Sequence, residues 1–448
     1  MKKITALLLC LVMLLSLAAC GGSNPTAATP APAAGTASDQ PEADAASPYE
    51  VTEPVAMEFW CSVAEEDRIA LLKDWVDEYN ASQDLVTVSF VSIPAYGTMD
   101  EQLSAAQAAG KGLPGLAFIN VPRIQTYAAS GMNEPLNAYI EATGFDIEDF
   151  NPGMIDGMVY DADGQIYGMP FGISSGVMYW NMDLLKAAGA DGIPETWSEL
   201  LALAPAIKEA AGAMAYGSLS ELNYNEVILR NAGADPLGDG VTATMMNDDL
   251  LSFLQEYKGM IDAGEAEYFM GSDANGNIMA SFYSGQLASM LQSSTLVNIV
   301  ESNCDFEVGT SFGLINDLDP AQSYIAGAAA LIPALNDQQT KNAAWDFLTW
   351  MLSKEHVFQW TKISNYYPSR ISVYTDEAMM AEIFEQVPLY ENILAGMDGV
   401  LSKNKTPYQT ACYKVINNAM GSYFYEGSDL EATWQAAEDE VNYILAGN

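Results

Sequence analysis

Residues 57–93 read MEFWCSVAEEDRIALLKDWVDEYNASQDLVTVSFVSI, and this stretch contains three successive patterns. The side chains of 57–60 alternate in character, which predicts a half-buried strand. In 65–80 apolar side chains recur every three or four residues, which predicts an amphipathic helix. Alternation returns in 86–93, so the stretch predicts a strand, a helix and a second strand.

The same rhythm continues toward the C-terminus. Residues 100–109 predict a helix that ends at Gly110, and 116–120 predict a short buried strand. This order of elements is typical of an α/β domain with a largely parallel sheet. A further strand is predicted at 177–180, and helices are predicted at 182–188, 197–211, 250–263, 278–285, 341–352, 355–362, 378–386, 408–420 and 431–445. The chain beyond residue 53 is long enough for two domains.

The first twenty residues predict export and lipid anchoring. Lys2 and Lys3 precede an apolar run at 4–17, which is shorter than the roughly 20 residues that a membrane-spanning helix needs. The run leads into LAAC at 17–20, which resembles a bacterial lipobox. That resemblance implies removal of a signal peptide (1–19), acylation of Cys20 and attachment to the extracytoplasmic face of a bacterial cell membrane. The alternative is an ordinary secretory signal with a chance cysteine.

Residues 20–53 predict a flexible, acidic tether between the anchor and a folded body. The segment is rich in Ala, Pro, Ser, Thr and Gly and contains no Lys or Arg. Such a composition cannot bury enough apolar surface to offset the entropy of an ordered chain. No later stretch predicts a membrane span, so the lipid is the only membrane attachment that we expect.

The charge balance argues against one class of partner. The chain carries a formal net charge of −42 at pH 7, from 59 acidic and 17 basic residues. A surface this acidic repels nucleic acid and anionic lipid headgroups. We therefore expect no nucleic-acid partner.

The cysteine and histidine content argues against most nucleophilic and metal chemistry. Cys61, Cys304 and Cys412 of the body have no CxxC spacing, so one disulfide is possible but we expect three mostly buried thiols. His356 is the only histidine, and its helical neighbours place it toward solvent, which leaves no Ser–His or Cys–His triad. No phosphate loop or dinucleotide fingerprint occurs. We expect no cofactor and no metal.

Acidic residues leave two alternatives open. Residues 161–165, DADGQ, could begin a calcium loop, but the further ligands are missing, so a tight turn is predicted. A glycosidase needs only two carboxylates, and 59 acids could supply such a pair. A secreted glycan-acting enzyme therefore stays an alternative, as does a surface lipoprotein used for adhesion.

Six motifs in the body resemble those of family 1 extracellular solute-binding proteins, and they occur in the order of that family. They are DGQIYGMP at 163–170, VMYWNMDLLKAAG at 177–189, PETWSEL at 194–200, FYSGQLASM at 282–290, IAGAAALIP at 325–333 and YPSR at 367–370. The resemblance covers effectively the whole body. It implies a binding protein, not an enzyme, that captures a small solute and presents it to the permease subunits of an ABC importer.

The fold that this resemblance implies is α/β and two-lobed, of the periplasmic-binding-protein kind, with a ligand cleft between lobes that close about a hinge. We expect a monomer. The predicted first lobe comprises 54–172 plus 305–345, and the predicted second lobe comprises 173–304 plus 346–448.

Four stretches narrow the resemblance: FW at 59–60, PAYG at 94–97 before EQLSA at 101–105, QSST at 292–295 and NYYP at 365–368. Within the family, they resemble the glycerol-3-phosphate-binding proteins of ABC importers most. The ligand contacts that this likeness implies are Tyr96, Ser174 near the hinge, Ser294, Gly327 and Tyr366. Two positions depart from that subgroup: Val121 stands where it carries a glutamate for glycerol hydroxyls, and Thr410 stands where it carries an arginine for phosphate. The missing arginine removes a charge-assisted fork for phosphate.

Polar and aromatic residues suggest the chemistry of the ligand. Ser293 and Ser294 precede an apolar helical run, so they either cap a helix or also contact a ligand. Trp60, Trp180 and Tyr408 join Tyr96 and Tyr366 at predicted strand ends or loops, where cleft residues tend to lie. Core packing is the alternative for each aromatic. We therefore expect a neutral sugar, oligosaccharide, polyol or glycerophosphodiester-like solute.

Overall fold

The computed structural model describes residues 47–93, 95–238, 240–314, 316–317, 322–402 and 405–447. The predicted signal peptide, Cys20 and most of the predicted tether lie outside these residues. Among the described residues, no helix combines the length and the apolar character that crossing a membrane requires.

A five-stranded sheet is built mainly from the first part of the chain. Its order is β2-β1-β3-β13-β6, with β1 (Val55–Cys61), β2 (Val86–Ser92), β3 (Leu116–Asn120), β6 (Met169–Ser174) and β13 (Ala326–Leu331). β1 pairs in parallel with both β2 and β3, whereas β13 runs antiparallel to β3 and β6. The largely parallel sheet predicted from 57–120 is confirmed, with one reversed strand that arrives from far along the chain.

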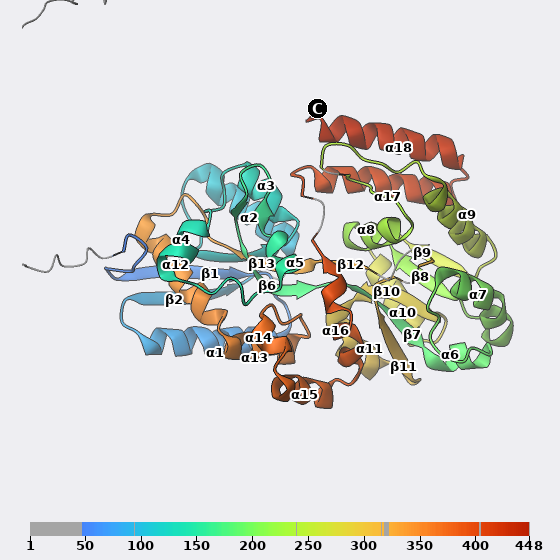
Figure 1. Cartoon of the computed structure of the whole chain (residues 1–448), viewed down its shortest axis with the longest axis horizontal. Helices are drawn as coiled ribbons and strands as arrows, with labels where there is room; N and C mark the ends of the chain where they lie inside the picture. Colours follow the sequence, from blue (N-terminus) through green and yellow to red (C-terminus); the bar gives the residue numbers. More distant parts are fainter. Residues whose placement is uncertain are drawn as a thin grey trace, which may run out of the picture. The chain divides into compact units, whose positions relative to one another are not determined.

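Helices pack on both faces of this first sheet (Figure 1). In that view α1 (Glu66–Ser82) and α13 (Lys354–Ser364) lie below the sheet, and α2 (Tyr96–Ala109) and α3 (Arg123–Ala129) lie above it. α12 (Gln338–Met351) packs against β1 and α1, and α4 (Asn137–Thr143) follows α3 in the chain. The helix predicted at 65–80 buries four of the five side chains expected from its spacing, Leu72, Trp75, Val76 and Tyr79, whereas Ile69 is half-buried.

A second five-stranded sheet has the order β11-β7-β10-β8-β9. Its strands are β7 (Gly176–Asn181), β8 (Tyr216–Leu219), β9 (Ala266–Phe269), β10 (Ser289–Ser293) and β11 (Val308–Phe312). β8, β9 and β10 are parallel, and β7 is antiparallel to β10 and β11. The helices that follow these strands include α6 (Met182–Ala187), α7 (Trp197–Ala211), α8 (Leu222–Asn231), α9 (Asp248–Asp262), α10 (Ala274–Tyr283) and α11 (Val297–Asn303).

The C-terminal part is helical, as predicted. It contains α14 (Ile371–Tyr374), α15 (Glu377–Gln386), α16 (Leu389–Leu394), α17 (Gln409–Tyr425) and α18 (Leu430–Leu445). The remaining elements are short: α5 (Pro152–Asp156), the hairpin of β4 (Val159–Tyr160) and β5 (Gln165–Ile166), the pair of β12 (Ser323–Tyr324) and β14 (Val400–Leu401), and two single-turn helices. The β4–β5 hairpin confirms the tight turn predicted at 161–165.

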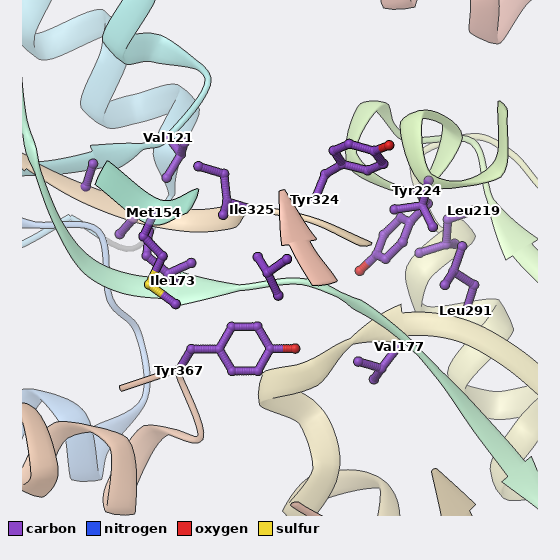
Figure 2. Close-up of a cluster of buried hydrophobic side chains, with 14 of the residues drawn as sticks. Val121, Met154, Ile173, Val177, Leu219, Tyr224, Leu291, Tyr324, Ile325 and Tyr367 are labelled. Carbon is purple, nitrogen blue, oxygen red and sulfur yellow. The ribbon is translucent and has the colours of Figure 1, made fainter. Parts of the chain in front are cut away.

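One strand crosses directly from the first sheet to the second, because only Ser175 separates β6 from β7. Buried apolar side chains surround this crossing. Figure 2 shows Ile173 and Val177 on either side of it, with the Tyr367 ring between them. All three side chains are at most 1 % exposed.

The structure corrects the predicted boundaries within the body. Residues 305–345 were assigned to the first lobe, but β11 pairs with β7 of the second sheet. Residues 346–448 were assigned to the second lobe, but α13 packs against α1 on the first sheet. Both errors have one cause: strand pairing and helix docking over long sequence separations leave no local pattern.

His356 is another correction, because it is buried and does not face solvent. Its ring lies 3.9 Å from the Trp350 ring and 4.8 Å from the Trp75 ring, centroid to centroid, and 9 % of the residue is exposed. Nδ1 lies 2.7 Å from the Ser353 hydroxyl and 2.9 Å from the Trp350 carbonyl oxygen. Burial lowers the pKa of His356 against the smaller effect of the Trp350 carbonyl. The covering rings belong to other elements, so α13 alone could not reveal them.

Candidate functional site

A cavity of about 230 Å³ lies where β1 and β2 end. Its lining residues are Cys61, Ser62, Val63, Ala64, Glu65, Arg68, Ala95, Tyr96, Phe118, Phe171, Ala328, Trp360 and Tyr366. Cys61 is the last residue of β1, and Tyr96 is the first residue of the helix that follows β2. In open α/β sheets, ligands bind at the carboxyl ends of the parallel strands. We therefore take this cavity as the candidate site.

Two larger cavities lie elsewhere. One, of about 540 Å³, is lined by Tyr49, Val51 and Val86, at the amino ends of β1 and β2. The other, of about 530 Å³, lies among α14, α15 and α16 and includes Met380 and Phe384. Neither is at the carboxyl ends of parallel strands, so size alone does not identify the site.

Aromatic rings form one wall of the candidate site. Trp360 and Tyr366 are stacked, with ring centroids 5.8 Å apart and an interplanar angle of 6°. Phe171 lies between Trp360 and Phe118, at 4.8 and 3.9 Å. Burial, and to a lesser extent the neighbouring Tyr366, raises the pKa of Tyr96 well above its usual value. The wall is apolar and neutral, and its flat rings suit the C–H faces of a sugar.

Two glycines make room for the Tyr366 ring. Gly327 has φ = 88°, and a Cβ at that position would lie 2.1 Å from the Gly172 carbonyl oxygen and 3.2 Å from the Tyr366 ring. A Cβ on Gly172 would lie 3.4 Å from the same ring. Only glycine has both the conformation and the space that position 327 requires. Gly327 therefore shapes the wall through its missing side chain.

A buried guanidinium forms the polar end of the cavity. Arg68 Nη2 donates a hydrogen bond to the Ser364 carbonyl oxygen at 3.1 Å, and Nη1 lies 3.2 Å from Glu65 Oε1. The guanidinium carbon lies 5.3 Å from the centre of the Tyr366 ring. Ser364 ends α13, so the cation also lies near a helix C-terminus, where positive charge is favoured. Arg68 could not be predicted as a site residue from local pattern, because the residues that bury it lie about 300 positions away in the chain.

The predicted serines lie at the crossing between the sheets. Ser174 ends β6 and is 4 % exposed. Ser294 donates its backbone N–H to the Ser175 carbonyl oxygen at 2.9 Å, and its hydroxyl accepts the Ser175 N–H at 3.3 Å. Ser293 caps the turn that follows, since its hydroxyl accepts the Thr295 N–H. Ser294 is fully buried and bonded within the protein, whereas Ser293 is half-buried.

The second sheet presents a polar group at the carboxyl ends of its parallel strands. Gln292, near the end of β10, hydrogen-bonds Tyr224 through its carbonyl oxygen and Asn275 through its amide nitrogen, the latter at 2.8 Å. Gln292 is 1 % exposed and Tyr224 is 8 % exposed. Only the neighbouring serines were predicted from sequence, because α8 and α10, which carry the partners, showed no motif.

Several predicted residues lie away from the cavity. Trp180 is fully buried in the second sheet and donates its indole N–H to Ser311 at 2.9 Å. Trp60 is 9 % exposed, and its indole N–H donates to Glu58 at 2.7 Å. Tyr408 is 40 % exposed just before α17. The structure thus brings together Tyr96, Tyr366 and Gly327, but not the two tryptophans or Tyr408.

The two positions that depart from the glycerol-3-phosphate subgroup also lie apart. Val121 is 4 % exposed, and its N–H donates to the Gly327 carbonyl oxygen at 3.0 Å. Thr410 is exposed in the first turn of α17. Neither residue lines the cavity of about 230 Å³.

The thiols and the carboxylates suggest no metal chemistry. Cys61, Cys304 and Cys412 are free, the first and last are buried, and burial raises the pKa of each. Within the described ranges, no group of His, Cys, Asp and Glu side chains is arranged to hold a metal ion.

The chain is similar in sequence to known binding proteins. Residues 74–385 match the model of a family described as bacterial extracellular solute-binding protein. A putative binding protein of Brucella abortus is 23 % identical over 384 residues, covering 82 % of this chain and 88 % of that protein. The sn-glycerol-3-phosphate-binding periplasmic protein UgpB of Yersinia pestis is 25 % identical over 387 residues, covering 80 % and 83 %.

Solved structures share the fold. The cyclic α-maltosyl-1,6-maltose binding protein of Arthrobacter globiformis superposes with a TM-score of 0.77 at 24 % identity, covering 88 % of this chain and all of that one. UgpB of Mycobacterium tuberculosis in complex with glycerophosphocholine superposes with a TM-score of 0.72 at 18 % identity, covering 88 % and 99 %. These likenesses confirm the predicted α/β, two-lobed periplasmic-binding-protein fold.

Proposed function

The chain belongs to the family of bacterial extracellular solute-binding proteins, and from that premise we propose that it captures a small, neutral, hydroxyl-rich solute for an ABC importer. The observation that carries the proposal is the cavity at the carboxyl ends of β1 and β2, which combines an aromatic wall with a polar end. Sugars offer C–H faces to aromatic rings and hydroxyls to polar groups. The relatives support a hydroxyl-bearing solute, since their names give a cyclic oligosaccharide, glycerol 3-phosphate and glycerophosphocholine as ligands, and the neutral charge is proposed from the cavity of this chain.

The size of the cavity bears on how the ligand is held. Pockets that enclose a drug-sized ligand measure roughly 300–1,000 Å³. A cavity of about 230 Å³ accommodates a smaller unit, such as one sugar ring or a glycerol moiety. We propose that the rest of a longer ligand contacts Gln292 and Ser293 at the end of β10 and Tyr224 on α8. Ser174 and Ser175 form the hinge in this proposal.

Binding is favoured over glycan hydrolysis by the carboxylates of the cavity. Retaining and inverting glycosidases use a pair of carboxyl groups that flank the scissile bond. Among the residues that line the cavity, Glu65 is the one carboxylate, and it is paired with Arg68. The proposal also includes lipid attachment through Cys20 and a monomeric protein that meets the permease subunits from outside the membrane.

The test is a thermal-shift screen of the purified full chain with maltose, longer maltooligosaccharides, glycerol and glycerophosphocholine. A ligand present at about 100 times its dissociation constant stabilises a folded protein by about 2.7 kcal/mol. We expect at least one of these solutes to raise the melting temperature. The variant Tyr366→Ala should lose that shift, because it removes the ring that stacks on Trp360.

Tyr425→Ala is the matched control for this test. Tyr425 is 49 % exposed on α17 and does not line the cavity, so this variant should keep the ligand-induced shift. Absence of any shift with every solute would contradict the proposed function. Release of reducing sugar from an oligosaccharide would replace it with the enzyme alternative.

A further inference from the structure

We infer that Glu65 is the specificity-determining residue that makes this cavity accept neutral solutes and reject anions, because it cancels the charge of Arg68. This inference deepens the proposed function and rests on it. It names a role that the departures at Val121 and Thr410 left open, namely how the site treats phosphate.

The net formal charge of the cavity lining is zero. Of its lining residues, only Arg68 and Glu65 carry formal charge, and the others are aliphatic, aromatic, hydroxyl or thiol side chains. Their charged groups lie 3.2 Å apart. The polar end of the cavity therefore contains one donor fork and one acceptor whose charges sum to zero.

Arg68 and Glu65 differ in how far their side chains are exposed to water. The Arg68 side chain is 9 % exposed, whereas the Glu65 side chain is 46 % exposed. A guanidinium that is mostly removed from water needs a compensating partner more than a carboxylate that stays hydrated. Glu65 thus supplies the negative charge that an anionic ligand would otherwise bring to Arg68.

Contacts with Ser364 and Tyr366 hold the Arg68 guanidinium at the cavity. Nη2 is bonded to the Ser364 carbonyl oxygen, and the guanidinium faces the Tyr366 ring at 5.3 Å. If Glu65 lost its charge, a preformed and poorly hydrated guanidinium would remain in the cavity. Such a group binds phosphate and carboxylate groups in a fork geometry.

Neutral hydroxyl groups do not compete with Glu65 for Arg68 as an anionic ligand does. A pair of neighbouring hydroxyls can accept a hydrogen bond from Arg68 and donate one to Glu65, which leaves both charges paired. A phosphate next to Glu65 meets like-charge repulsion instead. The geometry therefore favours polyols and sugar rings over sugar phosphates.

The experiment compares the full chain with Glu65→Gln, Glu65→Asp, Glu66→Gln and the double variant Glu65→Gln/Arg68→Met. The probes are glycerol 3-phosphate and inorganic phosphate, titrated at low ionic strength by calorimetry. Glu66 is the exposed neighbour of Glu65, so Glu66→Gln matches the charge change without touching the pair. Circular dichroism checks that each variant is folded.

We expect Glu65→Gln to bind glycerol 3-phosphate about tenfold or more tightly than the unchanged chain, with a steep dependence on salt. Glu65→Asp and Glu66→Gln should bind it as weakly as the unchanged chain. The double variant should lose the gain, because the guanidinium is then absent. A neutral solute found in the thermal-shift screen should bind more weakly to Glu65→Gln.

Other outcomes overturn the inference. It fails if the unchanged chain binds glycerol 3-phosphate as tightly as Glu65→Gln, or if Glu66→Gln produces the same gain. It also fails if the double variant keeps the gain, since Arg68 would then not be the anion receptor. If Glu65→Gln gains phosphate binding while no neutral solute binds the unchanged chain, the role of Glu65 stands and the proposed solute class fails.

Discussion

Gly327 and Arg68 have structural roles that cannot be inferred from the chemistry of their own side chains. Gly327 does not line the cavity, yet its φ of 88° and its missing side chain allow β13 to pair closely with β6 beside the Tyr366 ring. Arg68 acts in the opposite way, since a residue in the first turn of an amphipathic helix becomes the one buried cation of the cavity.

At this scale we predict that Gly327→Ala destabilises the protein and removes ligand binding. The new Cβ would lie 2.1 Å from the Gly172 carbonyl oxygen, so the strands must separate. We expect a loss of about 3 kcal/mol or more in the free energy of unfolding, measured with urea.

Gly189→Ala is a matched control for that prediction. Gly189 has φ = 85°, but a Cβ there would have no neighbour within 4 Å. The control should lose only the cost of the left-handed conformation, about 1–2 kcal/mol, and should keep ligand binding. Equal losses in the two variants would show that backbone strain, not the contact with Gly172, determines the role of Gly327.

At the scale of elements, local pattern was a good guide where a helix is amphipathic and capped. The helix predicted at 197–211 has those bounds in the structure, with Thr196 as its cap and Gly212 in a left-handed conformation at its end. The burial of His356 on α13 shows the limit of such patterns. Which side of α13 is covered depends on α1 and α12, and no periodicity within one helix contains that information.

The segment that joins α4 to α5 is held to α14 by Asp149. Asp149 accepts hydrogen bonds from Arg370 at 2.8 Å and from the Ser372 hydroxyl at 2.6 Å, which ties this segment to α14. The Asp149 and Arg370 side chains are 17 % and 11 % exposed. We expect Asp149→Asn to lower the free energy of unfolding by about 3 kcal/mol at pH 7, because it leaves a buried guanidinium without its counter-charge.

The pH dependence of this pair provides a further check. Burial by itself raises the pKa of Asp149, but the hydrogen bonds from Ser372 and Arg370 outweigh it, so the pKa lies below its ordinary value of 3.8. The stabilisation is therefore fully present above pH 3.8 and is lost as the pH falls through the lower folded value. The difference between the native chain and Asp149→Asn should shrink in that range. Asp74→Asn, a change at an exposed position of α1, is the control for the loss at pH 7 and should stay within about 0.5 kcal/mol.

At the scale of the whole molecule, the crossing between the two sheets is the decisive feature. Ser175 joins β6 to β7, and its hydroxyl lies 2.6 Å from the Tyr367 hydroxyl. Tyr367 also donates its backbone N–H to Ile173 at 2.7 Å, next to Tyr366 of the cavity wall. The buried Ser175–Tyr367 hydrogen bond thus connects the proposed hinge with the residue next to the aromatic wall of the cavity.

We predict that Tyr367→Phe and Ser175→Ala are not additive. Both residues are 1 % exposed, so each single change leaves a buried hydroxyl without this partner and should cost about 1–3 kcal/mol. The double variant should cost less than the sum, because no unpaired hydroxyl remains from that pair. Urea unfolding of the four chains measures the coupling.

Tyr425→Phe is the control for that cycle. The Tyr425 hydroxyl donates to the Tyr268 carbonyl oxygen and accepts the Tyr268 N–H, both at 2.9 Å, but Tyr425 is 49 % exposed, so water can replace the lost hydroxyl at both groups. Its loss should be within about 0.5 kcal/mol. Additive effects of Tyr367→Phe and Ser175→Ala would mean that the hydroxyl contact does not stabilise the crossing.

The fold class, most helices and the family can be predicted from the sequence, because periodicity, helix caps and short motifs are local properties of the chain. Of the ligand contacts predicted from sequence, Tyr96 and Tyr366 line one cavity and Gly327 lies against the Tyr366 ring, and their contact with a ligand stays a prediction. The sheet to which β11 belongs, the burial of His356 and the burial of the Arg68–Glu65 pair at that cavity become visible only in the folded protein. These depend on contacts between residues far apart in the chain, where burial and a neighbour's charge arise only once the elements have packed.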